Sequence, residues 1–239
     1  MPLQTIEPQR LYRQIAEQLR GLMNTGEFGV GSRLPAERDL AIELGVSRPS
    51  VREALIALEV EGVIEVRTGS GIYVKQAPLQ RSASAAAAEA AMEWGPLEVM
   101  SARLLVESEI AALAAQHAGK GHIKAMRQAL QDMRDEARAG QTPREGDEAF
   151  HEAIAKACGN SVLLDVVQRF WQARDGRLFE RLGAYFENPA SWQSAIAEHE
   201  QVLLAIEAGD ATAAKRAMQK HLRQAHKRYS ASWRRAPTR

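Results

Sequence analysis

The stretch that decides the fold is LPAERDLAIELGVSRPSVREALIALEVEGVIEVRTGSGIYV, residues 34–74. It contains two short helical patterns joined by the tight turn GVS, in which Ser47 is a residue type that caps the start of a helix. Apolar and polar residues then alternate on both sides of a Gly-Ser-Gly turn at 69–71, which predicts a β-hairpin. Because a further helical pattern covers residues 10–24, the order of elements predicts a winged helix-turn-helix whose wing is a small β-hairpin.

The second helix of such a motif enters the major groove of DNA by its N-terminal end. Here that end carries Arg48 and Arg52, one turn apart, which we expect to point outward beside the inward face that begins at Val51. Arginine bonds a guanine edge with two parallel hydrogen bonds, and serine binds phosphate. The candidate DNA-contacting residues are Arg38, Ser47, Arg48, Ser50, Arg52, Arg67 and Gly69.

The charge balance of this region leaves a second interpretation open. Residues 1–75 contain nine Lys or Arg and ten Asp or Glu, so the predicted domain is not basic overall. In the alternative, it is a small structural domain whose arginines pair with Glu37, Glu53 and Glu59. DNA binding is favoured because the arginines gather at the turn, the helix start and the wing.

Three motifs of this region carry a resemblance to a known family. They are the LPAER start, the SR-x-SVREAL helix and the G-x-G-x-YV wing, and they lie within residues 31–74. This segment resembles the DNA-binding domain of the GntR superfamily of bacterial transcription regulators. The resemblance implies a sequence-specific regulator whose base- and phosphate-contacting residues are Arg38, Ser47, Arg48, Arg52 and Gly69.

The whole chain has 239 residues, enough for two domains with separate cores. No apolar run approaches membrane-spanning length, the first residues lack a signal-peptide pattern, and Cys158 is the single cysteine. The cytoplasm is therefore the expected compartment. We expect a DNA-binding domain over residues 1–75, a linker over 76–93 that is poor in large apolar residues, and a second domain over 94–233.

The second domain has a helical pattern throughout. Breaks in this pattern fall near residues 119, 140–143, 159–160, 183–189 and 209–210. They predict about six or seven helices, enough for an all-α antiparallel bundle. The fold class of the chain is therefore mainly α.

The helical phase of a few polar residues predicts a metal site in this bundle. Asp147 and His151 are four residues apart and share the apolar face of their helix. His199 and His221 lie on the apolar faces of two later helices. A single inward histidine is more often a satisfied core residue, but three histidines with an aspartate favour a shared divalent ion. Zinc is the first choice for this ligand set, and nickel, manganese or iron also suit it.

A helix predicted over residues 95–116 is apolar almost all round, yet it carries Arg103 and Glu107 one turn apart. One interpretation is a salt bridge at the edge of the bundle. The other is that Arg103 binds the carboxylate of a ligand beside the metal, and Arg174 is a second candidate for this role. Trp171 is interpreted as a core residue rather than as a stacking platform.

Four segments carry a second resemblance: GPLEVMSARLLVESEIAALAA, the D-x-x-FH-x-x-I pattern, EHEQVLLAIEAGD and AMQKHL. Residues 95–230 look like the FCD domain, the all-helical ligand-binding domain of the FadR branch of GntR regulators. GPLEVMSARLLVES and FWQARD are most similar to the hexuronate-operon repressors. The resemblance implies that Arg103 anchors a carboxylate. It also implies four metal ligands, which are Asp147, His151, His199 and His221.

Together these features predict a ligand-responsive transcription regulator, a repressor in the family's commoner mode, that binds a palindromic double-stranded operator as a homodimer. A small carboxylate such as a hexuronate would bind the metal and Arg103 and change the spacing of the two DNA-binding domains. In an alternative, the metal itself is the effector. We expect no enzyme, because Glu152 points about 100° away on the helix from its neighbour His151 and no nucleophile motif is found.

Overall fold

The computed structural model describes residues 10–67, 69–75 and 94–230. It divides into two compact units, and the boundary between them falls after Leu97. The predicted linker over residues 76–93 lies outside the described residues. In the described part, no helix is both long and apolar enough to cross a membrane.

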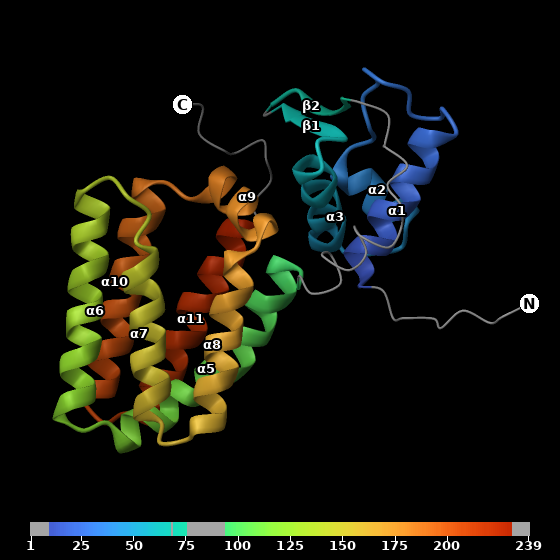
Figure 1. The fold of residues 1–239 in the computed structure, drawn as a ribbon. Coiled ribbons are helices and arrows are strands. Elements are labelled where there is room, and N and C mark those ends of the chain that lie inside the picture. Colours follow the sequence, from blue (N-terminus) through green and yellow to red (C-terminus); the bar gives the residue numbers. More distant parts are fainter. Residues whose placement is uncertain (1–9, 68, 76–93, 231–239) are drawn as a thin grey trace, which may run out of the picture. The chain divides into compact units, whose positions relative to one another are not determined.

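The first unit contains three helices and a hairpin in the predicted order (Figure 1). Its elements are α1 (Leu11–Asn24), α2 (Glu37–Glu43), α3 (Arg48–Val60), β1 (Ile64–Arg67) and β2 (Gly71–Val74). The strands pair antiparallel, with Ile64 opposite Val74 and Val66 opposite Ile72. The prediction of a winged helix-turn-helix is confirmed.

Local chemistry sets the turn between α2 and α3. Gly45 has a φ of 65°, which L side chains rarely adopt, and it ends the first of the two helices. The hydroxyl of Ser47 then caps α3, accepting a hydrogen bond from the backbone N–H of Ser50 at 3.2 Å. In α1, Leu11 is 48% exposed, and the buried face is formed by Tyr12, Ile15, Ala16, Leu19 and Met23.

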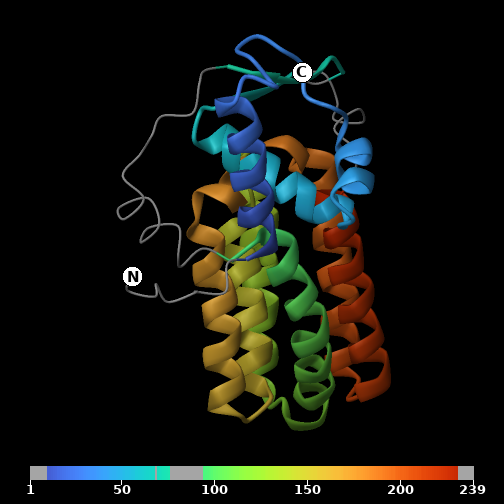
Figure 2. The same cartoon turned by 90° about the vertical axis from the view of Figure 1, so that its right-hand side faces the viewer.

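The second unit is a bundle of long helices, and Figure 2 shows them running alongside one another. In the described residues it contains seven α-helices and one short 3₁₀ helix: α5 (Pro96–His117), α6 (Lys120–Arg138), α7 (Arg144–Ala157), α8 (Ser161–Gln172), η1 (Ala173–Asp175), α9 (Arg177–Phe186), α10 (Pro189–Glu207) and α11 (Ala211–Tyr229). Short connections make neighbours antiparallel, and α6 packs against both α7 and α10, while α10 packs against α11. The predicted all-α bundle is confirmed.

One helix break was missed. The chain leaves the α8 direction at η1, and α9 begins after Gly176, where no break was predicted. The break predicted over residues 183–189 is present between Phe186 and Pro189, and Gly183 itself lies inside α9. A Cβ on Gly183 would lie 3.4 Å from the carboxyl carbon of Glu187, so the missing side chain leaves room for that acid.

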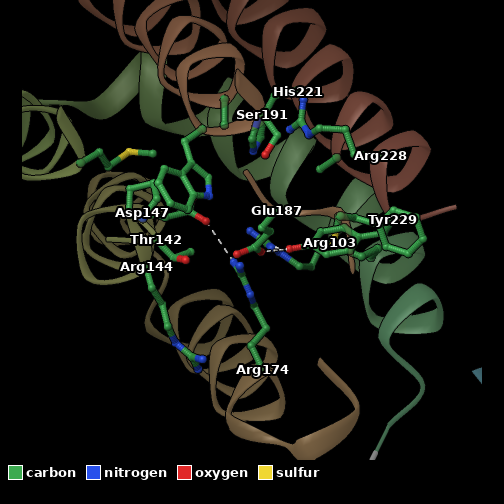
Figure 3. A pocket seen from close by; sticks show the side chains of 17 residues that line it. Arg103, Thr142, Arg144, Asp147, Arg174, Glu187, Ser191, His221, Arg228 and Tyr229 are labelled. Atoms are coloured by element: carbon green, nitrogen blue, oxygen red, sulfur yellow. Dashed lines mark hydrogen bonds and ion pairs between the residues drawn. The ribbon is translucent and has the colours of Figure 1, made fainter. Parts of the chain in front are cut away.

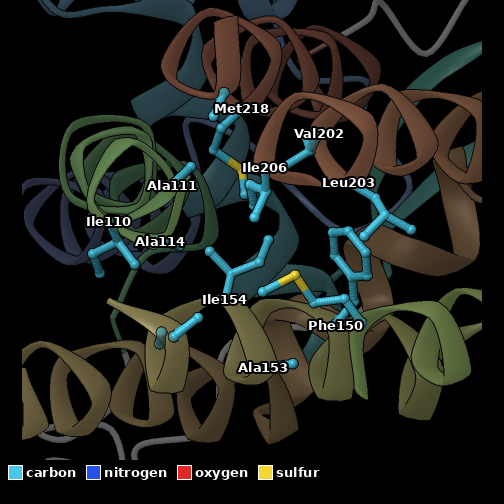
Figure 4. Close-up of a cluster of buried hydrophobic side chains, with 14 of the residues drawn as sticks. Ile110, Ala111, Ala114, Phe150, Ala153, Ile154, Val202, Leu203, Ile206 and Met218 are labelled. Atoms are coloured by element: carbon cyan, nitrogen blue, oxygen red, sulfur yellow. The ribbon is translucent and has the colours of Figure 1, made fainter. Parts of the chain in front are cut away.

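Apolar side chains from α5, α7, α10 and α11 fill the centre of the bundle (Figure 4). The labelled members of this cluster are Ile110, Ala111, Ala114, Phe150, Ala153, Ile154, Val202, Leu203, Ile206 and Met218. The predicted inward histidines continue the same helix faces, and the ring of Phe150 packs edge-on against His199 at a centroid distance of 4.9 Å. The core therefore holds the histidine side chains in place.

Candidate metal centre and ligand pocket

The structure brings together the four side chains that the sequence singled out as metal ligands. Asp147 and His151 come from α7, His199 from α10 and His221 from α11. One oxygen or nitrogen atom from each lies within 4.8 Å of the others. Asp147 Oδ1 is 3.0 Å from Nε2 of His199, and Nε2 of His199 is 3.2 Å from Nε2 of His151.

Close packing of α7 against α6 sets the position of Asp147. The preceding residue is Gly146, and a Cβ added there would lie 2.5 Å from the backbone nitrogen of Met133 and 2.9 Å from the carbonyl oxygen of Ala129. Only a residue without a side chain permits this approach. The glycine therefore fixes how far the first turn of α7 reaches into the bundle.

The three histidines each use Nδ1 for a hydrogen bond to the protein. His151 contacts Glu107, His199 contacts the carbonyl oxygen of Ala195 at 2.6 Å, and His221 contacts Glu198 at 2.9 Å. A carboxylate or carbonyl oxygen accepts a hydrogen bond, so Nδ1 carries a proton in each ring, and Nε2 presents a lone pair whenever the ring is neutral. The Nε2 atoms of His151 and His199 face each other at 3.2 Å, and the ring centroid of His221 lies 4.2 Å from that of His199, so three neutral rings would offer their lone pairs to one cation.

A carboxylate oxygen completes this group of acceptors. Asp147 Oδ1 is buried, and it accepts no well-formed hydrogen bond from any residue that the structure describes. A buried oxygen without a donor costs free energy, about 1–3 kcal/mol or more when it is charged. A divalent cation among the three lone pairs and this oxygen would satisfy all four together.

The pKa shifts of His221 and Asp147 agree with this arrangement, whereas that of His151 has the opposite direction. Burial and the nearby His199 and His151 hold the pKa of His221 well below its usual value, so this ring is neutral. Burial alone would raise the pKa of Asp147, but contacts with His151, His199 and Arg174 outweigh it and lower the pKa, so Asp147 is ionised. Burial would lower the pKa of His151, whereas Glu107 raises it above the ordinary value.

A cavity lies beside these four residues, and Figure 3 shows its wall. The cavity volume is about 70 Å³. This is several times the about 10–15 Å³ that one water molecule needs. It therefore has room for a small organic molecule. The polar and charged lining residues are Arg103, Thr142, Arg144, Asp147, Arg174, Glu187, Ser191, Trp192, His221, Arg228 and Tyr229.

Arginines outnumber acids in the pocket lining, by four to two. Arg103 and Arg174, the two predicted ligand-binding arginines, both lie over the ring of Trp171, at 4.8 and 4.2 Å from its centroid. Trp171 is buried, as the interpretation as a core residue expected, and its ring also packs against these two arginines. The indole N–H of Trp192 is buried and finds no acceptor within the described ranges, so it is available to an acceptor on a ligand.

Arg103 does form the salt bridge with Glu107 that was one of the two interpretations. The pair is not at the edge of the bundle, however, because both side chains are only 3% exposed. Since Arg103 also lines the pocket, the two interpretations do not exclude each other. The sequence missed Glu198 and Arg228, because their pairing joins α10 to α11 and depends on the mutual rotation of these helices.

In the first unit, a single acid holds the two arginines of the recognition helix α3. Glu37 accepts from Nε of Arg48 at 3.0 Å and from two nitrogens of Arg52 at 2.9 and 2.8 Å. The side chain of Arg52 is only 1% exposed, so the expectation that it points outward was wrong in this state of the protein. The pairing with Glu37 that the alternative interpretation expected is present.

The remaining candidate DNA-contacting residues lie nearer the surface. Arg38 is 76% exposed and pairs with Asp39, while Arg67 pairs with Glu65 and lies over the ring of Tyr73 at 4.5 Å. Gly69, at the tip of the wing, has a φ of 77°. The hydroxyls of Ser47 and Ser50 are 2.8 Å apart at the start of α3, where exposed N–H groups favour phosphate.

Comparison with known proteins agrees with this organisation. Residues 11–74 match the model for bacterial regulatory proteins of the gntR family, and residues 98–224 match the model for the FCD domain. A winged helix-turn-helix followed by a helical domain of this kind is a DNA-binding transcription regulator and not an enzyme. The chain belongs to the GntR family of bacterial transcription regulators and carries an FCD domain.

Characterised relatives extend over most of the chain. The Uxu operon transcriptional regulator of Escherichia coli K12 is 38% identical over 218 residues, which is 90% of this chain and 84% of that one. The Exu regulon transcriptional regulator of the same organism is 39% identical over 226 residues, covering 92% and 84%. Among solved structures, Streptococcus agalactiae GntR has a TM-score of 0.49 at 25% identity and covers 90% of this chain and 99% of that one. The chain is therefore related to regulators of hexuronate operons.

Proposed function

We propose that this regulator is controlled by a small carboxylate, a sugar acid such as a hexuronate, that binds at a divalent metal centre in the second unit. The observation that carries the proposal is the buried Asp147 Oδ1 without a donor, beside the converging Nε2 atoms of three histidines. These ligands fit zinc first, with nickel, manganese or iron as alternatives. The ion would supply charge stabilisation for an anionic ligand and open positions for its oxygens.

The charges of the pocket support an anionic effector. Arg103 offers a planar pair of donors to a carboxylate, and Arg174, held by Asp147 at 3.0 Å, places a second guanidinium beside the candidate metal ligands. The hydroxyls of Thr142 and Ser191 and the free indole N–H of Trp192 suit the hydroxyl groups of a sugar acid. The relationship to the Uxu and Exu regulators agrees with this ligand class.

We further propose that α3 and the wing read the operator. Arg48 and Arg52 would contact base edges, Arg38 and Arg67 the groove margin or phosphates, and the serines with Gly69 the phosphate backbone. One recognition helix reads only a few base pairs, so a palindromic operator bound by a homodimer follows. The ligand would favour one arrangement of the bundle helices and thereby lower operator affinity, which relieves repression.

A thermal-shift screen of the zinc-loaded protein tests the ligand class. Hexuronates and aldonates should raise the unfolding temperature, and lactate, pyruvate and citrate serve as comparison acids. The active compound should then lower the affinity for the operator. A flat response to all of these acids with metal present would contradict the proposed effector class.

A second candidate function is a metal sensor, since the four candidate ligands alone converge on one point. Operator binding measured against chelator and added metal, without any organic acid, separates the two functions. Full switching by metal alone would favour the sensor. Switching that requires both the metal and the sugar acid would favour the proposed function.

A further inference from the structure

A carboxylate outside the pocket lining joins one candidate metal ligand to one arginine of the pocket. Glu198 accepts from Nδ1 of His221 at 2.9 Å. The same carboxylate accepts from both terminal nitrogens of Arg228, at 2.8 and 3.2 Å. Arg228 lines the cavity, so Glu198 divides its charge between the ligand histidine and the pocket wall.

The same arrangement is found a second time, on different helices. Glu107 accepts from Nδ1 of His151 through one oxygen, and its other oxygen lies 2.5 Å from Nε of Arg103. Arg103 also lines the cavity. Two of the three histidines therefore have an outer carboxylate that is shared with a pocket arginine, whereas His199 has only a backbone carbonyl.

We propose that Glu198 and Glu107 are positioning residues of the metal centre, and that Arg228 and Arg103 set how strongly they act. The inference rests on the metal centre of the proposed function. A carboxylate on Nδ1–H fixes the ring, directs the Nε2 lone pair at the ion and makes the imidazole a stronger donor. A guanidinium on the same carboxylate draws negative charge away from the histidine, so it weakens this effect.

Opposite signs for two substitutions follow from this relationship. Glu198→Gln removes the charge that supports His221, so the affinity for zinc should fall about 10–100-fold, as when other outer partners of metal ligands are lost. Arg228→Gln leaves the whole charge of Glu198 to His221, so the affinity should rise severalfold. If the ion pair only held α10 to α11, both substitutions would weaken zinc binding alike.

Glu198 is a better test position than Glu107. Its side chain is 14% exposed and Arg228 is 24% exposed, whereas Glu107 and Arg103 are each 3% exposed and would be left unpaired in the core. A matched control lies two residues further along the same helix: Glu200 pairs with Arg134 at 3.0 Å and is 48% exposed. Glu200→Gln removes a surface ion pair of the same helix but leaves the contact between Glu198 and His221 in place.

The experiment is a chelator competition that gives the zinc dissociation constant of the full-length wild type and of Glu198→Gln, Arg228→Gln and Glu200→Gln. Circular dichroism of the metal-free proteins shows whether each variant folds. If Glu198→Gln does not fold, the zinc affinity of Arg228→Gln alone decides the test. We expect weaker zinc binding for Glu198→Gln, tighter binding for Arg228→Gln and no change for Glu200→Gln.

Two results would overturn the inference while leaving the metal centre intact. One is a zinc affinity of Glu198→Gln equal to that of Glu200→Gln, and the other is weaker binding in Arg228→Gln. A wild type that binds none of zinc, nickel, manganese or iron would be a different failure. It would refute the metal centre of the proposed function, and this inference with it.

Discussion

Asp147 uses its two carboxylate oxygens for different partners: Oδ2 accepts from Arg174 at 3.0 Å, while Oδ1 faces the three histidines without a donor. The guanidinium thus fixes the rotation of the carboxylate and leaves one oxygen for a cation. This division of roles lets one side chain serve both the candidate metal centre and the pocket.

Asp147→Asn should reduce zinc affinity by more than the about 10–100-fold that the loss of an outer partner costs. The amide removes the negative charge, and its nitrogen cannot bind a cation. Asp175→Asn is the control, because Asp175 is 74% exposed and pairs with Arg144 at the rim. Metal content measured after dialysis reports the result, and full occupancy of Asp147→Asn would remove Asp147 from the ligand set.

Arg103→Lys should weaken the response to a sugar acid while zinc remains bound. Lysine keeps the positive charge beside Glu107 but cannot offer two parallel donors to a carboxylate. A loss of about tenfold in ligand affinity corresponds to one charge-assisted hydrogen bond. Calorimetry with the active hexuronate measures it, and Arg127→Lys, an exposed pair with Glu207, is the comparison. An unchanged affinity would place the carboxylate elsewhere.

Arg48→Ala should weaken specific operator binding by about 1–3 kcal/mol, the usual contribution of a bidentate base contact. Arg48 is a cleaner test than Arg52, because it is 50% exposed and its removal leaves the pair between Glu37 and Arg52 in place. Fluorescence anisotropy with operator and scrambled DNA separates specific from non-specific binding. Arg20→Ala, on α1, is the control and should change neither specific nor non-specific DNA binding. If Arg48→Ala still distinguished operator from scrambled DNA as the wild type does, Arg48 would not be a base-contacting residue.

Gly146→Ala should destabilise the second unit, whereas Gly121→Ala should not. An added Cβ at Gly146 would meet the backbone of α6 at 2.5 Å, so the helices must separate, at a cost of about 1–3 kcal/mol. Gly121 lies in α6 with no atom within 4 Å of the added Cβ, and alanine there should stabilise by about 0.5–1 kcal/mol. Urea unfolding of both variants checks the opposite signs.

Zinc affinity should rise with pH above about 6.5, the ordinary histidine pKa. Glu107 raises the pKa of His151 in the metal-free protein, so this ring still holds a proton there that zinc must displace. As the pH rises through that pKa, His151 loses this proton, and zinc no longer competes with it for the ring nitrogen. His221, whose pKa is lowered, is already neutral and adds no dependence in this range. Zinc dissociation constants between pH 6 and 8 that do not change would contradict the assigned state of His151.

Much of this organisation was predictable because helical phase depends on local sequence. The apolar neighbours of His151, His199 and His221 placed all three on inward faces, and the structure brings them together. Likewise, the turn residues before α3 and between the strands predicted the DNA-binding fold. Each of these features can be recognised from the sequence of a single helix or turn.

The features that were missed depend on contacts between elements. The pairing of Glu198 with His221 and Arg228 depends on how α10 is rotated against α11, which no single helix reveals. The burial of Arg52 requires Glu37 from another helix. The break before α9 at Gly176 was missed as well.

The ion pair between Glu37 and Arg52 also bears on how the protein searches a genome. A regulator spends most of its time on wrong sequences, where phosphates attract every unpaired arginine. An arginine that already forms an ion pair inside the protein gains little binding free energy from those phosphates, because it would exchange a carboxylate for a phosphate. A base edge that accepts two hydrogen bonds would compensate for the loss of the two that Arg52 donates to Glu37. If Arg52 reads a base edge as proposed, we expect its pair with Glu37 to shorten the stay on incorrect DNA, so that the operator is found sooner.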